Sequence, residues 1–329
     1  MAHQIRAINW ILQHGEALSI HKQTWIEEVL PGWTDIDCEL QLNGEFFRGS
    51  GAGPSDDLAL CKGFAEALER GAVVASAKKS SNGFAAHLDS VLAKQLAIAE
   101  LKERDLFLCH FLTKTPFIRI DPWQEDRKIA DSIGAWKAKQ EVEVQFFSLS
   151  KEGVFCAISG FSAKSPFGMT GGTAIRSNLK DAAISAFIEA ARTATHFQNA
   201  EGSITPISVQ TFLEKSKHSF GDHGLLALNK EYAAGFLNQF CPSKSELDLP
   251  RQQAHNSLRD DEIEAMTIDW QPLQTPDCPF QFAHAASTSA QDLWLGPTKP
   301  EFINLRRLCE FTGRDLSLNE LNWAPHPFD

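Results

Sequence analysis

The sequence predicts an α+β fold in which mainly antiparallel sheets pack against helices, and three observations carry this prediction. Polar and apolar residues alternate with period two in 37–42 and again in 141–146, as in the half-buried strands of β-hairpins. Long apolar helices are predicted at 56–75, 89–113 and 178–197. A glycine-containing segment precedes each of these helices, so the hairpin-plus-helix unit recurs along the chain. Such an order favours pseudo-repeated hairpin-helix units over a doubly wound parallel sheet.

The two hairpins are the best-marked elements. Residues 37–42 alternate up to Asn43-Gly44, a dipeptide typical of tight hairpin turns, and 45–47 form the returning strand. Residues 141–146 alternate in the same way, and Lys151-Glu152-Gly153 leads into an apolar strand at 154–158. The remaining predicted elements are helices at 125–139 and 225–240, and strands at 265–270 and 280–285.

The flanking segments define the expected domain organisation. Residues 1–35 are predicted to form an N-terminal helical segment before a single catalytic domain at 36–329. Residues 242–260 are polar and interrupted by Pro242 and Pro250, which predicts a mobile loop. The chain ends in a proline-containing tail at 323–329.

The three long helices share a charge pattern. Glu66-x-x-Glu69-Arg70 recurs as Glu100-x-x-Glu103-Arg104, and the third helix has Glu189 followed by Arg192. Positions i and i+3 lie on one face of a helix, so each doublet points two carboxylates the same way. Burying such a pair is costly without a cation, and the flanking residues are largely apolar. The pattern therefore favours a divalent metal with a polyphosphate shared between the helices, although a solvated glutamate face has the same spacing.

Glycines cluster before each of these helices. They occur at 49–53, before Ser55 as a helix cap, at 80–86, and at 170–174, before Ser177 or Asn178 as a cap. A glycine-rich turn can bring backbone N–H groups close to phosphate oxygens, but simple turns use glycine too. No Gly-Lys-Ser/Thr follows, so a Walker-type phosphate loop is excluded.

Composition narrows the function class. The net charge of -11 argues against a nucleic-acid partner. The N-terminus lacks the apolar core of a signal peptide, and no segment reaches the ~18–20 apolar residues that span a bilayer, so a cytoplasmic protein is expected. Seven scattered cysteines without Cys-x-x-Cys indicate buried free thiols. Cys109-His110 would point about 100° apart on a helix, which favours packing over nucleophilic catalysis.

These motifs resemble the YcaO-domain proteins. The resemblance rests on ALCKGFAEALERG (59–71), SNGFAAH (81–87) with ELKERD (100–105), the helix around Glu189, and the terminal WAPHPFD (323–329), which is similar to the family's Pro-x-Pro end. It implies ATP- and Mg2+-dependent phosphorylation of backbone amides in a ribosomal precursor peptide, which forms azolines from Cys, Ser or Thr. It also implies a complex that contains a leader-peptide-binding protein, and it allows a flavin-dependent azoline dehydrogenase as a further subunit.

The resemblance also implies roles for particular residues. The implied metal ligands are Glu66, Glu69, Glu100 and Glu103. The implied nucleotide-binding residues are Lys62, Arg70, Ser81, Asn82, Arg104, Glu189 and Arg192. The implied catalytic residues of an ordered tail are Pro325, Pro327 and Asp329.

The sequence departs from the family pattern in two ways. Lys62 stands where many members have serine, and the interval between the two glutamate doublets is short. Two alternatives stay open, and only the first of them follows from these departures. One is a non-catalytic scaffold subunit of a peptide-modifying complex, and the other is an enzyme that forms thioamides or amidines.

Overall fold

The computed structural model describes residues 2–14, 16–42, 44–76, 82–124, 126–160, 167–199, 204–241, 257–270 and 277–327. The chain divides into two compact units, which are described separately. The first unit comprises Met1–Leu101 and Asp260–Ser287, and the second comprises Lys102–Arg259 and Thr288–Asp329.

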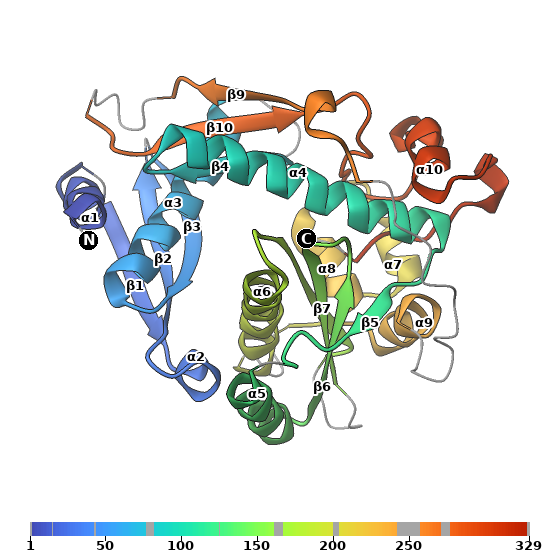
Figure 1. Cartoon of the computed structure of the whole chain (residues 1–329), viewed down its shortest axis with the longest axis horizontal. Helices are drawn as coiled ribbons and strands as arrows, with labels where there is room; N and C mark the ends of the chain where they lie inside the picture. The colour runs from blue at the N-terminus through green and yellow to red at the C-terminus, as the bar shows by residue number, and fades with distance from the viewer. Residues whose placement is uncertain are drawn as a thin grey trace. The chain divides into compact units, whose positions relative to one another are not determined.

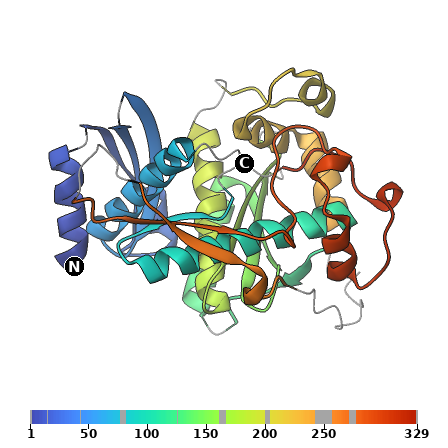
Figure 2. The same ribbon diagram turned by 90° about the horizontal axis from the view of Figure 1, so that it is seen from above.

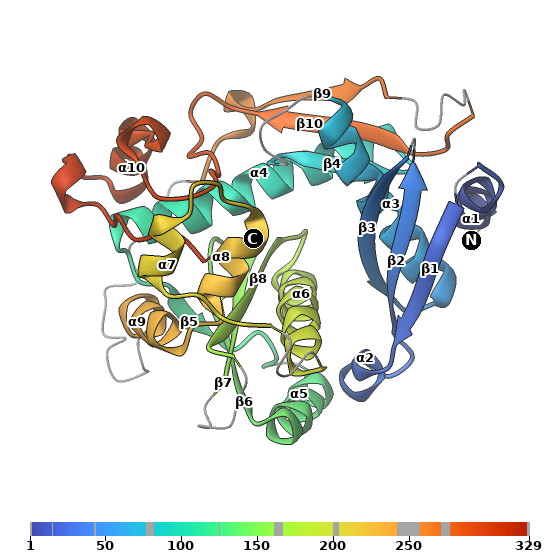
Figure 3. The same ribbon diagram turned by 180° about the vertical axis from the view of Figure 1, so that it is seen from behind.

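The first unit is built on a three-stranded antiparallel sheet of order β1-β2-β3. Helices α1 and α3 pack on one face of this sheet, where Trp10 and Phe64 join a core with Leu40 (Figures 1 and 3). The elements are α1 (Ala2–His14), β1 (Glu16–Gln23), α2 (Trp25–Val29), β2 (Thr34–Leu42), β3 (Glu45–Gly53) and α3 (Asp56–Ala75).

A second small sheet completes the first unit. Strand β10 (Gln281–Ala286) lies between β4 (Phe84–His87) and β9 (Glu264–Ile268), and it pairs antiparallel with both (Figure 2). A short 3-10 helix, η2 (Asp260–Glu262), precedes β9. Helix α4 (Ser90–Thr113) follows β4, and the boundary between the units falls within it, after Leu101.

The second unit is built on a four-stranded antiparallel sheet of order β5-β6-β7-β8. One face carries α5 and α6, where Trp136 packs edge-on against Phe187. The other face carries the end of α4, α9 and the C-terminal segment, around a core that contains Phe107, Phe155 and Phe236. The elements are β5 (Ile118–Ile120), α5 (Arg127–Gln140), β6 (Val142–Ser148), β7 (Gly153–Gly160), β8 (Met169–Ile175), α6 (Leu179–Asn199), α7 (Val209–Glu214), α8 (Phe220–Ala227), α9 (Lys230–Phe240), η4 (Pro300–Phe302), α10 (Leu305–Thr312) and η5 (Leu318–Glu320).

The two units repeat one motif. Apart from the short α2 between β1 and β2, the order α1-β1-β2-β3-α3 in the first unit matches α5-β6-β7-β8-α6 in the second. The helix after the last strand approaches that strand closely in both units. A Cβ at Gly49 would overlap the Gly63 carbonyl, and a Cβ at Gly172 would overlap the Ala186 carbonyl. The predicted α+β fold with pseudo-repeated hairpin-helix units is therefore confirmed.

Several sequence-based expectations are confirmed in detail. Both hairpins form, and Gly44 adopts a φ of +83° in the first turn, whereas Asn43 lies outside the described residues. The Ser55 side chain accepts from the Leu58 N–H at the start of α3, and Asn178 accepts from the Asp181 N–H before α6. Cys109 and His110 are buried in the core, and burial raises the Cys109 pKa well above its usual value.

Three expectations need correction. Residues 16–23, inside the segment expected to be helical, form β1, because they pair with β2 and so extend the first sheet. The helix expected at 225–240 is two helices, since Asn229 caps α9 by accepting from the Tyr232 N–H. The glycines at 49–53 and 170–174 lie in β3 and β8 rather than in turns, because close helix packing excludes a side chain there. Most of the predicted mobile loop, 242–256, lies outside the described residues.

Candidate functional site

Glu66 of α3 accepts hydrogen bonds from Ser50 on the edge strand of the first sheet. β3 is an edge strand, so half of its backbone N–H groups have no strand partner. The Glu66 Oε2 accepts from the Ser50 N–H at 2.9 Å and from the Ser50 hydroxyl at 3.2 Å, and its Oε1 accepts from Arg70 at 2.8 Å. The carboxylate is thus fixed against the strand that precedes its own helix.

Glu189 of α6 makes the equivalent contact in the second unit. Its Oε2 accepts from the Thr173 N–H of edge strand β8 at 2.9 Å. Donor and acceptor are 16 residues apart in both units, and Ser50 and Thr173 each follow the glycine against which the helix packs. The two glutamates are therefore counterparts in the internal repeat.

A second carboxylate meets the same threonine. The Thr173 hydroxyl donates to Glu103 of α4 at 2.5 Å, and the backbone N–H of Ile175 also contributes a hydrogen bond. Glu103 is buried, and desolvation raises its pKa above the usual value, opposed by the nearby charges of Arg104 and Arg176. A buried carboxylate in this setting is under-compensated, and a bound cation would stabilise its charged form.

A narrow pocket adjoins Glu189. It lies beside β8 at Gly171 and is lined by Phe107 of α4, Thr193 of α6 and Pro327 of the tail. Its free volume of about 30 Å³ suffices for water and is far below the few hundred Å³ of typical ligand pockets. The predicted nucleotide residue Glu189 and the predicted catalytic residue Pro327 therefore line one pocket.

The tail up to Pro327 is fixed by hydrogen bonds within the second unit. The Tyr232 hydroxyl donates to the Pro325 carbonyl at 2.5 Å, and Thr298 donates to the Ala324 carbonyl at 2.8 Å. Pro325 and His326 are buried. The predicted ordered tail is therefore present as far as Pro327, whereas Phe328 and Asp329 lie outside the described residues.

His223 stacks on His326 of the tail and donates a hydrogen bond to its carbonyl. The rings of His223 and His326 lie 4.1 Å apart at 12°. The Gly296 N–H donates to the His223 Nε2 at 3.0 Å, so this nitrogen is an acceptor and Nδ1–H donates to the His326 carbonyl at 2.7 Å. Nε2 of His326 lies 2.9 Å from the Trp294 carbonyl. Desolvation lowers the His223 pKa, in agreement with a neutral ring in this position.

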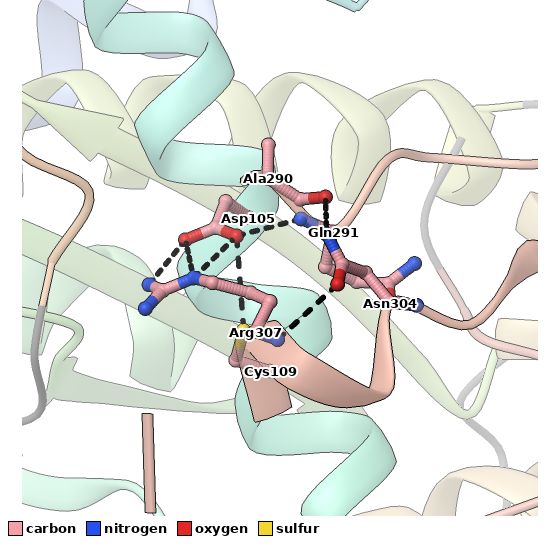
Figure 4. Close-up of polar contacts among 6 residues, drawn as sticks. All are labelled: Asp105, Cys109, Ala290, Gln291, Asn304 and Arg307. Carbon is pink, nitrogen blue, oxygen red and sulfur yellow. Dashed lines mark hydrogen bonds and ion pairs between the residues drawn. The ribbon is translucent and has the colours of Figure 1, made fainter. Parts of the chain in front are cut away.

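Asp105 anchors the C-terminal segment to α4 (Figure 4). Its carboxylate receives Arg307 Nε at 2.9 and 3.1 Å and Nη2 at 2.6 Å, and it accepts from the Gln291 N–H at 2.8 Å. Asp105 is 0% exposed and Arg307 2% exposed. Asn304 links the two halves of this network, because its N–H donates to Gln291 and its side chain accepts from the Arg307 N–H.

The other predicted residues are distributed over both units. Lys62 is on α3, and its ammonium donates to the Ala52 carbonyl at 2.9 Å. Asn82 is buried, and Ser81 lies outside the described residues. Glu69, Glu100, Arg104 and Arg192 are half-buried on their helices. In the described ranges, no three His, Cys, Asp or Glu side chains form a group that could hold a metal ion alone. A shared site for the four predicted metal ligands stays a prediction.

Sequence reasoning missed Ser50, Thr173, Asp105, Arg307 and His223. Asp105 carried a readable signal, because it is an acid directly followed by Leu106, Phe107 and Leu108, and an acid in a buried helix requires a partner. Ser50 and Thr173 had only a weak signal, a polar residue beside glycine. Nothing in the sequence connects His223 with His326.

Comparison with known families decides the relationship. The family model described as YcaO cyclodehydratase, ATP- and Mg2+-binding, matches residues 76–275, which is more than half of the chain. The chain belongs to the YcaO family. ATP and Mg2+ are therefore its cofactors. A search of curated protein sequences gives no significant match.

Solved structures share the fold of this chain. A structure described as a heterocyclase in complex with substrate and cofactor matches with a TM-score of 0.68 at 10% identity, over 99% of this chain and 57% of that one. This YcaO chain thus spans little more than half the length of that heterocyclase. A chain of the E. coli microcin synthetase McbBCD complex matches with a TM-score of 0.59 at 12% identity, over 94% of this chain and 96% of that one. The same complex with pro-MccB17 bound matches with a TM-score of 0.52 at 14% identity, covering 80% and 66%.

The residues of this YcaO chain fit Mg2+ with ATP. Mg2+ prefers oxygen ligands and is usually held by one or two carboxylates together with substrate phosphates, rather than by a cage of protein ligands. Glu103 and Glu189 supply such oxygens around Thr173, and Arg104 and Arg176 lie close enough to affect the Glu103 charge. Among the helices that the structure describes, none combines the length and the apolar character of a membrane span.

Proposed function

We propose that this chain is the ATP- and Mg2+-dependent cyclodehydratase subunit of a complex that forms azolines from Cys, Ser or Thr in a ribosomal precursor peptide. The observation that carries the proposal is the pair of carboxylates on Thr173, with Glu103 buried and Glu189 beside the tail. Membership of the YcaO family supports ATP as the activating substrate.

Loss of water from an amide requires the carbonyl oxygen to leave. When bound with Mg2+, ATP would supply the γ-phosphoryl group for this oxygen and leave as ADP, after a neighbouring thiol or hydroxyl has added to the carbonyl carbon, so that the oxygen could depart as phosphate. Glu103 and Glu189 would contribute negative charge to hold the metal, and Thr173 fixes both through its hydroxyl and its N–H. Arginines such as Arg104 would balance charge on the phosphates.

The tail would position the peptide. Pro325 and Pro327 restrict the backbone, and the Pro325 carbonyl is held by Tyr232. The pocket beside Glu189 reaches Pro327, so tail and carboxylate adjoin the same space. We propose that a separate leader-binding protein delivers the precursor peptide and that a flavin-dependent dehydrogenase is a further subunit. The similarity to a chain of the McbBCD complex supports assembly with partners.

The test compares Glu103→Gln and Glu189→Gln with Glu310→Gln. Glu310 is a matched control, because it is an exposed helix glutamate in an i,i+4 pair with Arg306. We expect calorimetry to show that Mg2+-dependent ATP binding is lost in the first two variants and unchanged in the control. Mass spectrometry of the precursor peptide should show one water lost per ring only with active chains. Equal ATP binding in all three variants would contradict the assignment.

A scaffold subunit that lacks ATP turnover is the second candidate. Lys62 replaces the expected serine, and its ammonium is bonded to the Ala52 carbonyl. The free space beside Glu189 is also too small for a nucleotide in this conformation. A chain that binds the partner proteins but neither binds nor hydrolyses ATP would support this candidate. A product with sulfur in place of the amide oxygen, or an amidine, would instead support the other enzymatic outcomes.

A further inference from the structure

A second and much larger cavity lies in the second unit, between α9 and the start of α7. It is an open groove with a free volume of about 510 Å³, in the size range of sites that hold small ligands or short peptide segments. Its floor is one face of α9, formed by Tyr232, Gly235, Phe236 and Gln239, at the i, i+3, i+4 and i+7 spacing of a single helix face. This volume contrasts with that of the narrow pocket beside Glu189.

The groove wall suits a peptide backbone. Gln210, Gln239 and Asn322 line it, and a side-chain amide has both a donor and an acceptor, as a peptide bond does. Within the chain, Gln210 donates to Glu214 at 2.9 Å and Asn322 accepts from the Ala324 N–H at 3.1 Å, which leaves the Gln210 carbonyl oxygen and the Asn322 amide N–H groups to face a ligand. Below this polar rim lie Phe111 and Phe236, which are almost fully buried and provide an apolar base. A polar rim over an aromatic base is the usual composition of a site for short peptide segments.

The residues that line the groove carry one negative charge, which disfavours anionic ligands. Of the described residues that line it, Glu231 carries the only charge. No lysine or arginine is among them, so a phosphate-bearing ligand such as a nucleotide has no partner there. A neutral peptide fits this lining, and a peptide with a basic side chain near Glu231 fits it better.

Gly235 leaves open space above the floor of the groove. It lies inside α9, where glycine destabilises a helix relative to alanine. Its φ is not positive, and a Cβ built on it meets no atom within 4 Å, so the fold itself does not require glycine. Glycine at this position keeps the floor of the groove open and lets a ligand backbone approach the helix.

The groove is continuous with the tail. Asn322 and Ala324 line it, and the Tyr232 hydroxyl on its floor donates to the Pro325 carbonyl. We infer that this groove binds an extended segment of the peptide substrate that flanks the modified residue, with a basic side chain placed at Glu231. The identity of the ligand as substrate rests on the proposed function, whereas peptide binding in the groove can be measured without it.

The experiment measures direct binding of labelled Gly/Ser peptides that carry one Lys, one Glu or neither, by fluorescence anisotropy without ATP. We expect the Lys peptide to bind about two- to five-fold more tightly than the Glu peptide, the range of an exposed ion pair. Glu231→Gln should abolish this preference, and Glu231→Lys should reverse it. Equal binding of the three peptides to the native chain would overturn the inference.

Filling the groove gives the second test. Gly235→Trp places a large side chain in the open space. The dissociation constants of all three peptides should rise by about tenfold or more, because a tenfold rise requires the loss of only a few contacts. Gly134→Trp is the matched control, because Gly134 is also an exposed glycine inside a helix, α5, with no atom within 4 Å of a built Cβ, and it does not line the groove. The same affinities in both tryptophan variants would overturn the inference.

A smaller change protects the test against misfolding. Gly235→Ala favours the helix and should still weaken the peptides several-fold, with a melting temperature at least as high as that of the native chain. If both single variants, Gly235→Ala and Gly235→Trp, bound the peptides as tightly as the native chain, the inference that peptides bind in this groove would be wrong. If the native chain did not bind ATP, the proposed function would be contradicted. The inference about the groove would be unaffected, because peptide binding is measured without nucleotide.

Discussion

Asp105→Asn is expected to destabilise the second unit strongly. Arg307 is 2% exposed, and three of its contacts go to the Asp105 carboxylate. Asparagine keeps the shape but removes the charge, and it turns an amide group toward a donor of Arg307. Breaking a buried pair from one side costs about 3–5 kcal/mol, because the remaining charge stays buried without compensation. This corresponds to about two to four powers of ten in the unfolding equilibrium.

The assay is urea unfolding followed by circular dichroism, arranged as a double-mutant cycle. Asp105→Leu with Arg307→Met removes both charges, so the pair should cost less than Asp105→Asn alone, and about 1–3 kcal/mol remains for the Gln291 N–H that loses its acceptor. Arg306→Met is the control on the same helix, since its ion pair is exposed and worth at most about 1 kcal/mol. A cost for Asp105→Asn no larger than that of Arg306→Met would refute this reasoning.

Four further outcomes are expected. Thr173→Val removes the hydroxyl from Glu103 and should cost about 1–3 kcal/mol in urea unfolding while weakening Mg2+-dependent ATP binding in calorimetry. The pKa of His223 is lowered in the folded chain, so the free energy of unfolding should be independent of this group above about pH 6.5 and should fall by up to about 1.4 kcal/mol per pH unit below it. His223→Gln should make melting temperatures depend less on pH in this range. Gly49→Ala should destabilise by about 3 kcal/mol, because its Cβ meets backbone, and an unchanged melting temperature would contradict the close packing. Gly235→Ala should stabilise by about 0.5–1 kcal/mol in the same assay.

Local sequence determined the elements that could be predicted. The three long helices begin and end close to their predicted positions, because Ser55 and Asn178 cap two of them and their apolar runs exceed the length of any strand. The hairpins followed from their alternation and from the glycine turn at Gly44. In these cases neighbouring residues carry the physical cause.

Long-range pairing limited the remaining predictions. Gly49 and Gly172 are strand residues because a helix many positions later lies against them, and that contact is not visible in the local sequence. β1 depends on β2 for its hydrogen bonds, so its own residues do not identify it as a strand, and the sequence predicts a helical segment there. Within the candidate site, the family motifs located Glu103 and Glu189, but the threonine that joins them became apparent only from the structure.

The contacts of Glu66, Glu189 and Asp105 differ widely in how much chain they enclose, and this has a consequence for the order of folding. Ser50 with Glu66 and Thr173 with Glu189 are each separated by 16 residues, whereas Asp105 and Arg307 are separated by 202. Short loops close at a smaller entropic cost than long ones, so contacts of low sequence separation form first. Each glutamate should therefore be seated on its strand before the C-terminal segment reaches α4. Docking of the C-terminal segment through Arg307 would then be the last step, and a chain in which it has not yet docked would already hold Glu66 and Glu189 in place.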